Sequence, residues 1–347
     1  MRRHVPFERL HNFRDLGGCR TAGGGIVRWG TLYRSDSLGK LADAGPADLE
    51  RFRELGVTTV IDLRHPWEIA AKGRLPETWD VAWHNLSVEH RPYDQAEIDP
   101  DLDPWRYLAD RFAEVAEDGA VELRTALEVI AAADGPLVFH CASGKDRTGL
   151  LAAVLLALLE VPDEEILADF ALTERATERL IADWRASHPG RALRWPGYGR
   201  APAEIIRLFL AGLRARYGSV HAYATGHVGL DPAVVTALRT RLVEPPAASG
   251  LRHPDGDTAP YGLVEPSLPD DSAPAALPVG TAAGPTGPAA CPLPVDGAEG
   301  SPADLSDDHD SSPDPSYSSY SSSSYSPSSD TSSSDEGHGS PYGDEPC

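Results

Sequence analysis

The chain has 347 residues and a formal net charge of −22 at pH 7, from 31 basic and 53 acidic side chains. This acidity argues against nucleic acid as a partner, because phosphate backbones attract basic surfaces. The four cysteines, Cys19, Cys141, Cys291 and Cys347, show neither metal-ligand spacing nor a disulfide framework, so we expect no metal ion and no other cofactor.

The first residues do not form a secretory signal, because Val5–Leu10 is interrupted by proline, glutamate and arginine. We therefore expect a cytoplasmic protein, and leave open export by a route that needs no cleavable signal. Residues 12–18 read Asn-Phe-Arg-Asp-Leu-Gly-Gly, and further glycines follow at 23–25. Such glycines are typical of hairpin turns, so we interpret this region as a structural buttress, with Arg34 as a residue that could face a ligand.

The body of the chain alternates between strand and helix patterns. A helix is predicted at 41–55 and strands at 56–63, 79–86 and 136–139. Helical patterns then dominate, at 104–117, 121–133, 148–159, 164–186, 203–217, 220–225 and 232–241. This order predicts an α/β fold with a central sheet flanked by helices. The apolar run Leu150–Leu159 has ten residues, which is too short for a transmembrane segment.

The strand at 136–139 leads into His-Cys-Ala-Ser-Gly-Lys-Asp-Arg-Thr-Gly, in which Cys141 stands six positions before Arg147. Backbone N–H groups of residues 142–147 can point into one concavity, and the positive end of the following helix adds attraction for phosphate. We therefore expect phosphate to be bound by the residues of this loop: Ala142, Ser143, Gly144, Lys145 and Arg147.

The residue types in the loop fit phosphate-ester chemistry. A thiol at a helix N-terminus beside cations ionises near neutral pH, which makes Cys141 a candidate nucleophile. The planar guanidinium of Arg147 can hold two phosphoryl oxygens in the transition state, a task that lysine cannot perform. The alternative is a buried structural cysteine in an ordinary turn. A Walker-type nucleotide loop does not fit, because Asp146 follows Lys145 and no glycine stands five positions before Gly144.

The loop resembles the Cys-x5-Arg-Thr/Ser signature of the protein tyrosine phosphatase superfamily. Its Gly-Lys-Asp-Arg-Thr-Gly form resembles the bacterial atypical tyrosine phosphatases, of which some members also accept phosphoserine, phosphothreonine and phosphoinositides. The same branch is matched by other stretches, namely 12–18, 32–36, 60–64 with Glu68, and 216–220. The resemblance extends over about residues 8–243, and it implies a tyrosine phosphatase-like fold.

The resemblance also implies a role for each loop residue. Cys141 forms a phosphocysteine intermediate, Arg147 binds the phosphate, and His140 orients the loop and keeps the thiolate ionised. Thr148 donates its hydroxyl to the departing sulfur when the intermediate is hydrolysed. Lys145 adds positive charge beside the pocket.

The general acid is the least defined role, because no carboxylate upstream of Cys141 lies in a Trp-Pro-Asp context. In the bacterial branch the aspartate inside the loop takes this role, and here that residue is Asp146. Its position at the rim of the cavity allows it to reach a leaving oxygen; the alternative is that it caps the following helix. Asp62 and Arg64 are further candidates for the phosphate site, where Asp62 either positions water or forms a plain ion pair with Arg64.

The resemblance implies a protein tyrosine phosphatase that acts on phosphotyrosine-containing proteins, with phosphoserine, phosphothreonine and phosphoinositides as further candidates. One alternative is a cysteine-based inositol-phosphate phosphatase, which would favour a more basic pocket. Another is a catalytically silent module that binds phosphopeptides. The intact Cys141, Arg147 and Thr148 count against the silent module.

The composition changes sharply near residue 245. Residues 245–347 contain 18 of the 31 prolines, 17 of the 53 acidic residues and one basic residue, Arg252, which gives this segment a charge of about −16. Its few apolar residues cannot offset the entropy lost on folding, so we predict a long disordered, acidic, Pro/Ser-rich tail after a catalytic domain at 1–244. The tail is either a solvating extension, or a segment that is phosphorylated, visits the pocket as an acidic mimic, or binds a regulatory partner.

Overall fold

The computed structural model describes residues 3–94 and 98–246. These residues all belong to one compact unit, Met1–Asp257. The predicted tail at 245–347, apart from its first two prolines, lies outside the described residues.

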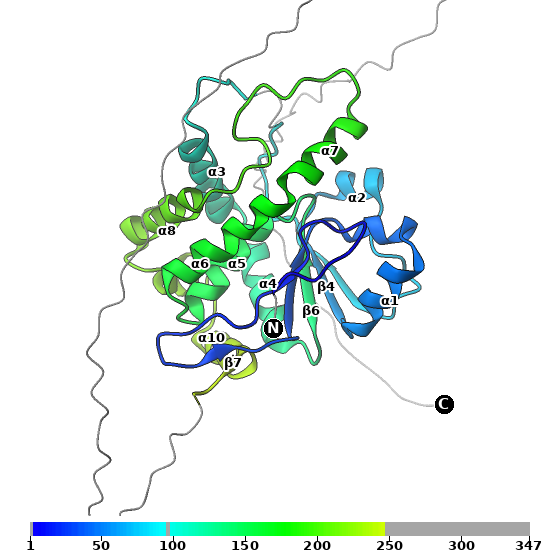
Figure 1. Ribbon diagram of the computed structural model, residues 1–347. Helices are drawn as coiled ribbons and strands as arrows, with labels where there is room; N and C mark the ends of the chain where they lie inside the picture. The colour runs from blue at the N-terminus through cyan, green and yellow to red at the C-terminus, as the bar shows by residue number, and fades with distance from the viewer. Residues whose placement is uncertain (1–2, 95–97, 247–347) are drawn as a thin grey trace, which may run out of the picture. The chain divides into compact units, whose positions relative to one another are not determined.

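A five-stranded sheet forms the centre of this unit (Figure 1), with the strand order β1-β3-β6-β4-β5. Its strands are β1 (Arg14–Asp15), β3 (Leu32–Ser35), β4 (Thr59–Asp62), β5 (Ala82–Asn85) and β6 (Leu137–His140). The pairings are parallel except for that of β1 with β3. Ser35 and Asp62 both pair with His140, so β3 and β4 end beside the last residue of β6. The loop that contains Cys141 therefore begins at this edge of the sheet.

The helices and the small second sheet complete the unit. The α-helices are α1 (Pro46–Glu54), α2 (Pro66–Lys72), α3 (Pro104–Asp118), α4 (Ala120–Ala132), α5 (Asp146–Leu158), α6 (Asp163–Ala171), α7 (Thr177–Ser187), α8 (Ala203–Tyr217), α9 (Val220–Ala222) and α10 (Pro232–Leu242). Shorter turns are the 3-10 helices η1 (Leu38–Asp43) and η2 (Leu172–Ala176) and the π-helical η3 (Tyr223–His227). The second sheet pairs β2 (Ile26–Val27) with β7 (Val243–Glu244).

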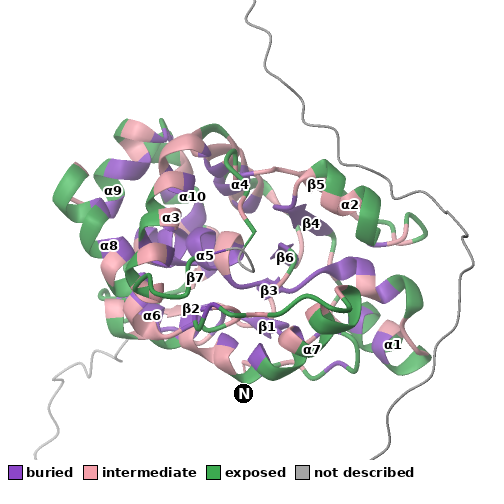
Figure 2. Ribbon diagram, turned by 90° about the horizontal axis from the view of Figure 1, so that it is seen from above, coloured by how far each residue is buried: buried purple, intermediate pink, exposed green. Residues whose placement is uncertain are grey.

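Successive side chains of a strand point to opposite faces of the sheet, and apolar side chains on both faces form two hydrophobic cores. In β6, Leu137 and Phe139 join the core formed with α3, α4, α5, α6, α8 and α10, whereas Val138 joins the core beneath η1 and α1. Figure 2 shows this buried layer between the two groups of helices. The predicted α/β fold with a central sheet flanked by helices is confirmed.

Helix α5 follows the loop that contains Cys141 directly and is buried around nearly its whole circumference. Ten of its thirteen residues, including Leu150 through Leu156, are buried. Helices that are apolar all round belong to the interior of a protein, so α5 anchors the loop to the main core. Within the described ranges, no helix is long and apolar enough to cross a membrane.

Three of the predicted helices are divided in the structure, and the one expected at 220–225 consists of α9 and the π-helical η3. The prediction of one helix at 41–55 is wrong in its first half, because the 3-10 helix η1 ends at Asp43 and α1 begins only at Pro46. Proline lacks an N–H and is suited to the first turn of a helix, which explains the new start. The helix expected at 164–186 is interrupted by the 3-10 turn η2 between α6 and α7.

Candidate active site

The loop between β6 and α5 is held by hydrogen bonds from outside it. Gly144 has a φ of 67°, and a Cβ at this position would lie 2.5 Å from the carbonyl oxygen of Ser35, so only glycine fits. The backbone N–H of Ser37 donates to the carbonyl of Ala142 at 3.1 Å, and Arg34 Nη2 donates to the carbonyl of Gly144 at 2.8 Å. Arg34 is fully buried, so it braces the loop from behind instead of facing a ligand.

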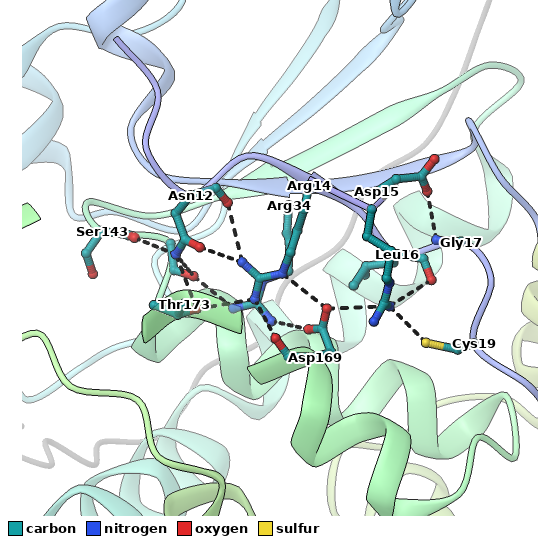
Figure 3. Close-up of polar contacts among 12 residues, drawn as sticks. Asn12, Arg14, Asp15, Leu16, Gly17, Cys19, Arg34, Ser143, Asp169 and Thr173 are labelled. Atoms are coloured by element: carbon teal, nitrogen blue, oxygen red, sulfur yellow. Dashed lines mark hydrogen bonds and ion pairs between the residues drawn. The ribbon is translucent and has the colours of Figure 1, made fainter. Parts of the chain in front are cut away.

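Asn12 braces the same loop from the N-terminal segment (Figure 3). Its Nδ2 donates to the carbonyls of Ser143 and Gly144 at 3.0 and 3.1 Å. The segment 12–18, interpreted from the sequence as a buttress, therefore contacts the catalytic loop directly. The carbonyls of Ala142, Ser143 and Gly144 all accept hydrogen bonds from donors outside the loop. In a trans peptide the N–H points opposite to the C=O, so the N–H groups of the next residues point the other way, toward the concave side of the loop.

Arg147 lies in the first turn of α5 and is clamped by Glu68 of α2. Arg147 Nη1 and Nη2 donate to the two carboxylate oxygens of Glu68 at 2.5 and 2.9 Å, and the side chains are only 11% and 12% exposed. Burial favours the neutral guanidinium, but the hydrogen bonds to Glu68 raise the pKa of Arg147 above its ordinary value. Burial also opposes ionisation of Glu68, yet Arg147 holds the pKa of this carboxyl below its usual value. This two-pronged geometry fixes the plane of the guanidinium.

A second carboxyl group, that of Glu89, lies near Arg147 Nε. Its Oε2 is 3.7 Å from Arg147 Nε, and its side chain is 12% exposed. Burial raises the pKa of Glu89, although Arg147 acts in the opposite direction. The sequence pattern assigns no role to Glu68 or Glu89. Glu68 stood within a matched stretch, whereas Glu89 lies in the loop after β5 with no motif to mark it.

His140 and Asp62 lie side by side at the ends of their paired strands. His140 is fully buried, its Nδ1 is 3.2 Å from the carbonyl oxygen of Cys141, and its Nε2 is 3.6 Å from Asp62 Oδ2. Burial lowers the pKa of His140, so the neutral imidazole is favoured. Burial opposes ionisation of Asp62 as well, but the hydrogen bonds and the charge of Arg64 lower the pKa of this carboxyl.

Arg64 is enclosed and its donors are occupied by protein groups. Nε and Nη2 donate to the carboxylate of Asp62 at 2.9 and 2.6 Å, and Nη1 donates to Ser37 Oγ at 2.9 Å. Arg64 and Asp62 are 1% and 0% exposed. The pair thus supports the loop through Ser37, whose N–H donates to the carbonyl of Ala142. Phosphate binding by Asp62 and Arg64 stays a prediction, and this geometry does not favour it.

The remaining loop residues differ in their access to solvent. Lys145 is buried, with Nζ 3.3 Å from the carbonyl oxygen of Arg200 and 3.3 Å from Asp146 Oδ1. Asp146 is 21% exposed and is the first residue of α5, while the N-cap position is Lys145, so the alternative of a capping aspartate is not favoured. Thr148 is buried, and its Oγ1 has no hydrogen-bond partner among the described residues. Cys141 is also buried, at the base of the loop.

The chain matches, over residues 5–244, the family described as "Tyrosine phosphatase family". It belongs to this family. A protein of Cupriavidus necator provisionally named a tyrosine-protein phosphatase is 33% identical over 255 residues, which cover 70% of this chain and 87% of that protein. The triple specificity protein phosphatase PtpB of Mycobacterium tuberculosis is 30% identical over 200 residues, which cover 49% of this chain and 69% of that protein.

A tyrosine-protein phosphatase of Nostoc commune is also 30% identical, over 61% of this chain and 74% of that protein. The predicted membership of the tyrosine phosphatases and the predicted hydrolase activity are confirmed by these matches: the protein is a protein tyrosine phosphatase. Among solved structures, that of P. aeruginosa TpbA aligns over 62% of this chain and 88% of that chain, at 17% identity and a TM-score of 0.23. A score this low carries no argument about this chain.

Proposed function

We propose that this tyrosine phosphatase cleaves phosphomonoesters through a phosphocysteine at Cys141. The observation that carries the proposal is the loop itself, in which three successive carbonyls are bonded outward while Arg147 is clamped by Glu68 at the rim. Inward N–H groups and a fixed guanidinium suit the three equatorial oxygens of a phosphoryl group in transfer.

The first step transfers the phosphoryl group to sulfur. The Cys141 thiolate attacks phosphorus, the S–P bond forms as the P–O ester bond breaks, and the leaving oxygen takes a proton from Asp146. In the second step water attacks the phosphocysteine, Asp146 accepts a proton from this water, and phosphate is released as the thiolate returns. Thr148 donates its hydroxyl to the departing sulfur. Neutral His140, bonded to the Cys141 carbonyl, positions the loop.

Asp146 is proposed as the general acid because of its place in the loop and its access to solvent. It is the most exposed of the three charged side chains at 145–147, because Lys145 and Arg147 are largely enclosed. A leaving group that enters the pocket from outside therefore meets the carboxyl of Asp146 first. Lys145, 3.3 Å away, helps to hold this carboxyl in place.

The preferred substrates are proposed to be phosphotyrosine-containing proteins. Phosphoserine, phosphothreonine and phosphoinositides are second candidates, because a relative is named a triple specificity protein phosphatase. Three carboxyl groups, those of Glu68, Glu89 and Asp146, flank the cations of the loop, and such a rim disfavours the highly charged inositol phosphates. A purely phosphopeptide-binding role would not need the intact Cys141.

The test is metal-free hydrolysis by the full chain of a panel that contains phosphotyrosine, phosphoserine and phosphothreonine peptides, phosphoinositides and inositol hexakisphosphate. Cys141→Ser serves as the blank. Faster turnover of phosphotyrosine peptides than of every other class is the expected result. Turnover confined to inositol phosphates, or binding without turnover, would overturn the proposal.

The division of the chain into a catalytic domain at 1–244 and a tail at 245–347 also stays a proposal. It is supported by the change of composition and by the end of the family match at residue 244. A regulatory partner of the tail and a cytoplasmic location remain predictions from the sequence.

A further inference from the structure

Behind the catalytic loop, three arginine side chains converge on a single carboxylate (Figure 3). Asp169 Oδ1 lies 3.1 Å from Arg14 Nε and 3.5 Å from Arg3 Nη2, and Asp169 Oδ2 lies 2.7 Å from Arg34 Nη1. The side chains of Arg14 and Arg34 are 3% and 0% exposed, that of Arg3 is 20% exposed, and that of Asp169 is 1% exposed. The group is therefore an interior cluster of charges.

This cluster holds more positive than negative charge. Across the described residues, no carboxylate other than Asp169 forms an ion pair with Arg3, Arg14 or Arg34. Burial and the neighbouring Arg14 lower the pKa of Arg34 to about 9, which still leaves it charged at pH 7. Buried charge is costly unless it is paired, so two positive charges in this cluster lack a counter-charge of their own.

A cavity of about 700 Å³ opens beside the cluster. None of the described residues that line it carries a carboxylate, and six of them bear side-chain nitrogen: Arg3, His4, His11, Asn12, Arg14 and Arg175. None of residues 141–147 lines it, so it is separate from the pocket above Cys141. Its volume lies within the usual range for small-molecule sites.

Two buried nitrogen atoms of this lining have no hydrogen-bond partner among the described residues, namely Arg3 Nε and His11 Nδ1. The His11 side chain is only 9% exposed, and its other nitrogen, Nε2, lies 3.0 Å from Asp183 Oδ2. Because the pKa of His11 is lowered, Nδ1 of the neutral ring is an acceptor and not a donor. A buried donor without a partner is costly in a folded protein, and at Arg3 Nε an anion would supply the missing acceptor.

The two histidines indicate a positive potential in the cavity. Burial and the charges of Arg175 and Arg14 lower the pKa of His4. Burial and Lys40 lower the pKa of His11, although Asp36 and Asp183 act in the opposite direction. Nearby positive charges of this kind attract anions.

We propose that this cavity is a second anion site, which binds a phosphate dianion either free or as the head group of a small phosphomonoester. Arg3, Arg14 and Arg175 supply charge, and Arg3 Nε supplies a hydrogen bond. The site adjoins the catalytic loop through one residue: Arg14 Nη1 donates to Asn12 Oδ1 at 2.5 Å, and Asn12 Nδ2 holds the carbonyls of Ser143 and Gly144. Binding in the cavity thereby stabilises the bracing of the loop.

The test counts bound phosphate by equilibrium dialysis of the full chain against radiolabelled inorganic phosphate. The wild type is expected to bind two phosphates per chain, one above Cys141 and one in the cavity. Arg175→Glu reverses an exposed charge at the cavity, and it should raise the Kd of the second phosphate at least about tenfold. Arg185→Glu reverses an exposed charge that does not line the cavity, and it should retain both phosphates.

A third variant separates this proposal from the proposed catalytic function. Arg147→Met removes the guanidinium of the catalytic loop, and it should lose the first phosphate while it keeps the second. A wild type with a single phosphate, or an Arg175→Glu variant that retains both phosphates with unchanged Kd, would overturn the second site. If Arg147→Met unfolds in a thermal melt, the comparison of Arg175→Glu with Arg185→Glu decides the question. Phosphomonoester binding is then read by competition, with glycerol phosphate displacing the second phosphate.

Discussion

Replacement of Glu68 by glutamine tests the clamp on Arg147. Removal of one partner of a buried ion pair lowers the free energy of unfolding by about 3–5 kcal/mol. Here the two side chains keep some contact with water, and the glutamine amide still accepts one hydrogen bond. We therefore expect a loss of about 2–3 kcal/mol. The amide N–H₂ of glutamine would also face a guanidinium that needs acceptors. Arg147 would then leave its fixed plane, and a displacement of about 1 Å can cost about 100-fold in rate.

Two assays of Glu68→Gln follow from this reasoning. Urea denaturation should show a lower free energy of unfolding, and kcat on an aryl phosphate should fall about 100-fold with a smaller change in KM. The matched control is Glu77→Gln, whose carboxylate is 81% exposed beside Arg74 and should contribute less than about 0.5 kcal/mol. If Glu68→Gln left both the unfolding curve and kcat at the level of the control, the clamp would not position Arg147.

The clamp also has a pH dependence with a definite sign. The pKa of Glu68 is lowered in the folded protein, so its stabilising contribution is fully present above the unfolded pKa and is lost as the pH falls through the lowered folded pKa. The wild type should therefore lose its stability advantage over Glu68→Gln under acidic conditions. An advantage that stayed constant down to the lowest pH measured would argue that Glu68 contributes by packing alone.

Three further variants test other parts of the account. Asp146→Asn should slow cleavage of esters with poor leaving groups more than that of activated aryl phosphates, as steady-state kinetics would show; equal slowing would indicate a structural role. Gly144→Ala should destabilise the protein by at least about 2 kcal/mol, because of the positive φ and the contact with the Ser35 carbonyl, and a melting temperature equal to that of the wild type would contradict the loop geometry. Deletion of 245–347 should leave the fold and the basal activity in place, as circular dichroism and turnover would show, and an insoluble product would refute the proposed domain boundary.

The strand and the helix on either side of Cys141 could be predicted from the sequence because their patterns are local, whereas the catalytic roles of the residues between them stay predictions. Cys141 follows β6 directly and Arg147 lies in the first turn of α5, and both elements were predicted near their observed bounds. The α/β fold followed from the alternation of strands and helices for the same reason. Long elements with a strong apolar pattern, such as α8, were also predicted at their observed positions.

The parts that were not predicted depend on contacts between distant segments. Helix α2 has seven residues, none of them buried, so it carries no periodic apolar pattern, yet it delivers Glu68 to Arg147. Glu89 reaches the same guanidinium only because β5 pairs with β4 beside the loop. Strand β1 has two residues and is defined by its partner β3. Local propensity has no information about such pairings.

The cluster around Asp169 shows the same limit. Arg14 and Arg34 could be recognised as parts of matched stretches, but their shared carboxylate stands on α6, far along the chain. The sequence therefore allowed Arg34 to be assigned to the ligand side of the loop, whereas the structure places it behind the loop. Only the fold decides on which side of a loop a charged residue lies.

The measurement that tests the central claim most directly is rapid quenching of the full chain during turnover of a phosphotyrosine peptide, followed by mass spectrometry of its proteolytic fragments. The account predicts a phosphoryl group on the fragment that contains Cys141, formed and consumed at the rate of turnover, and no such group and no turnover with Cys141→Ser. A phosphoryl group on another residue, or turnover retained by Cys141→Ser, would contradict it.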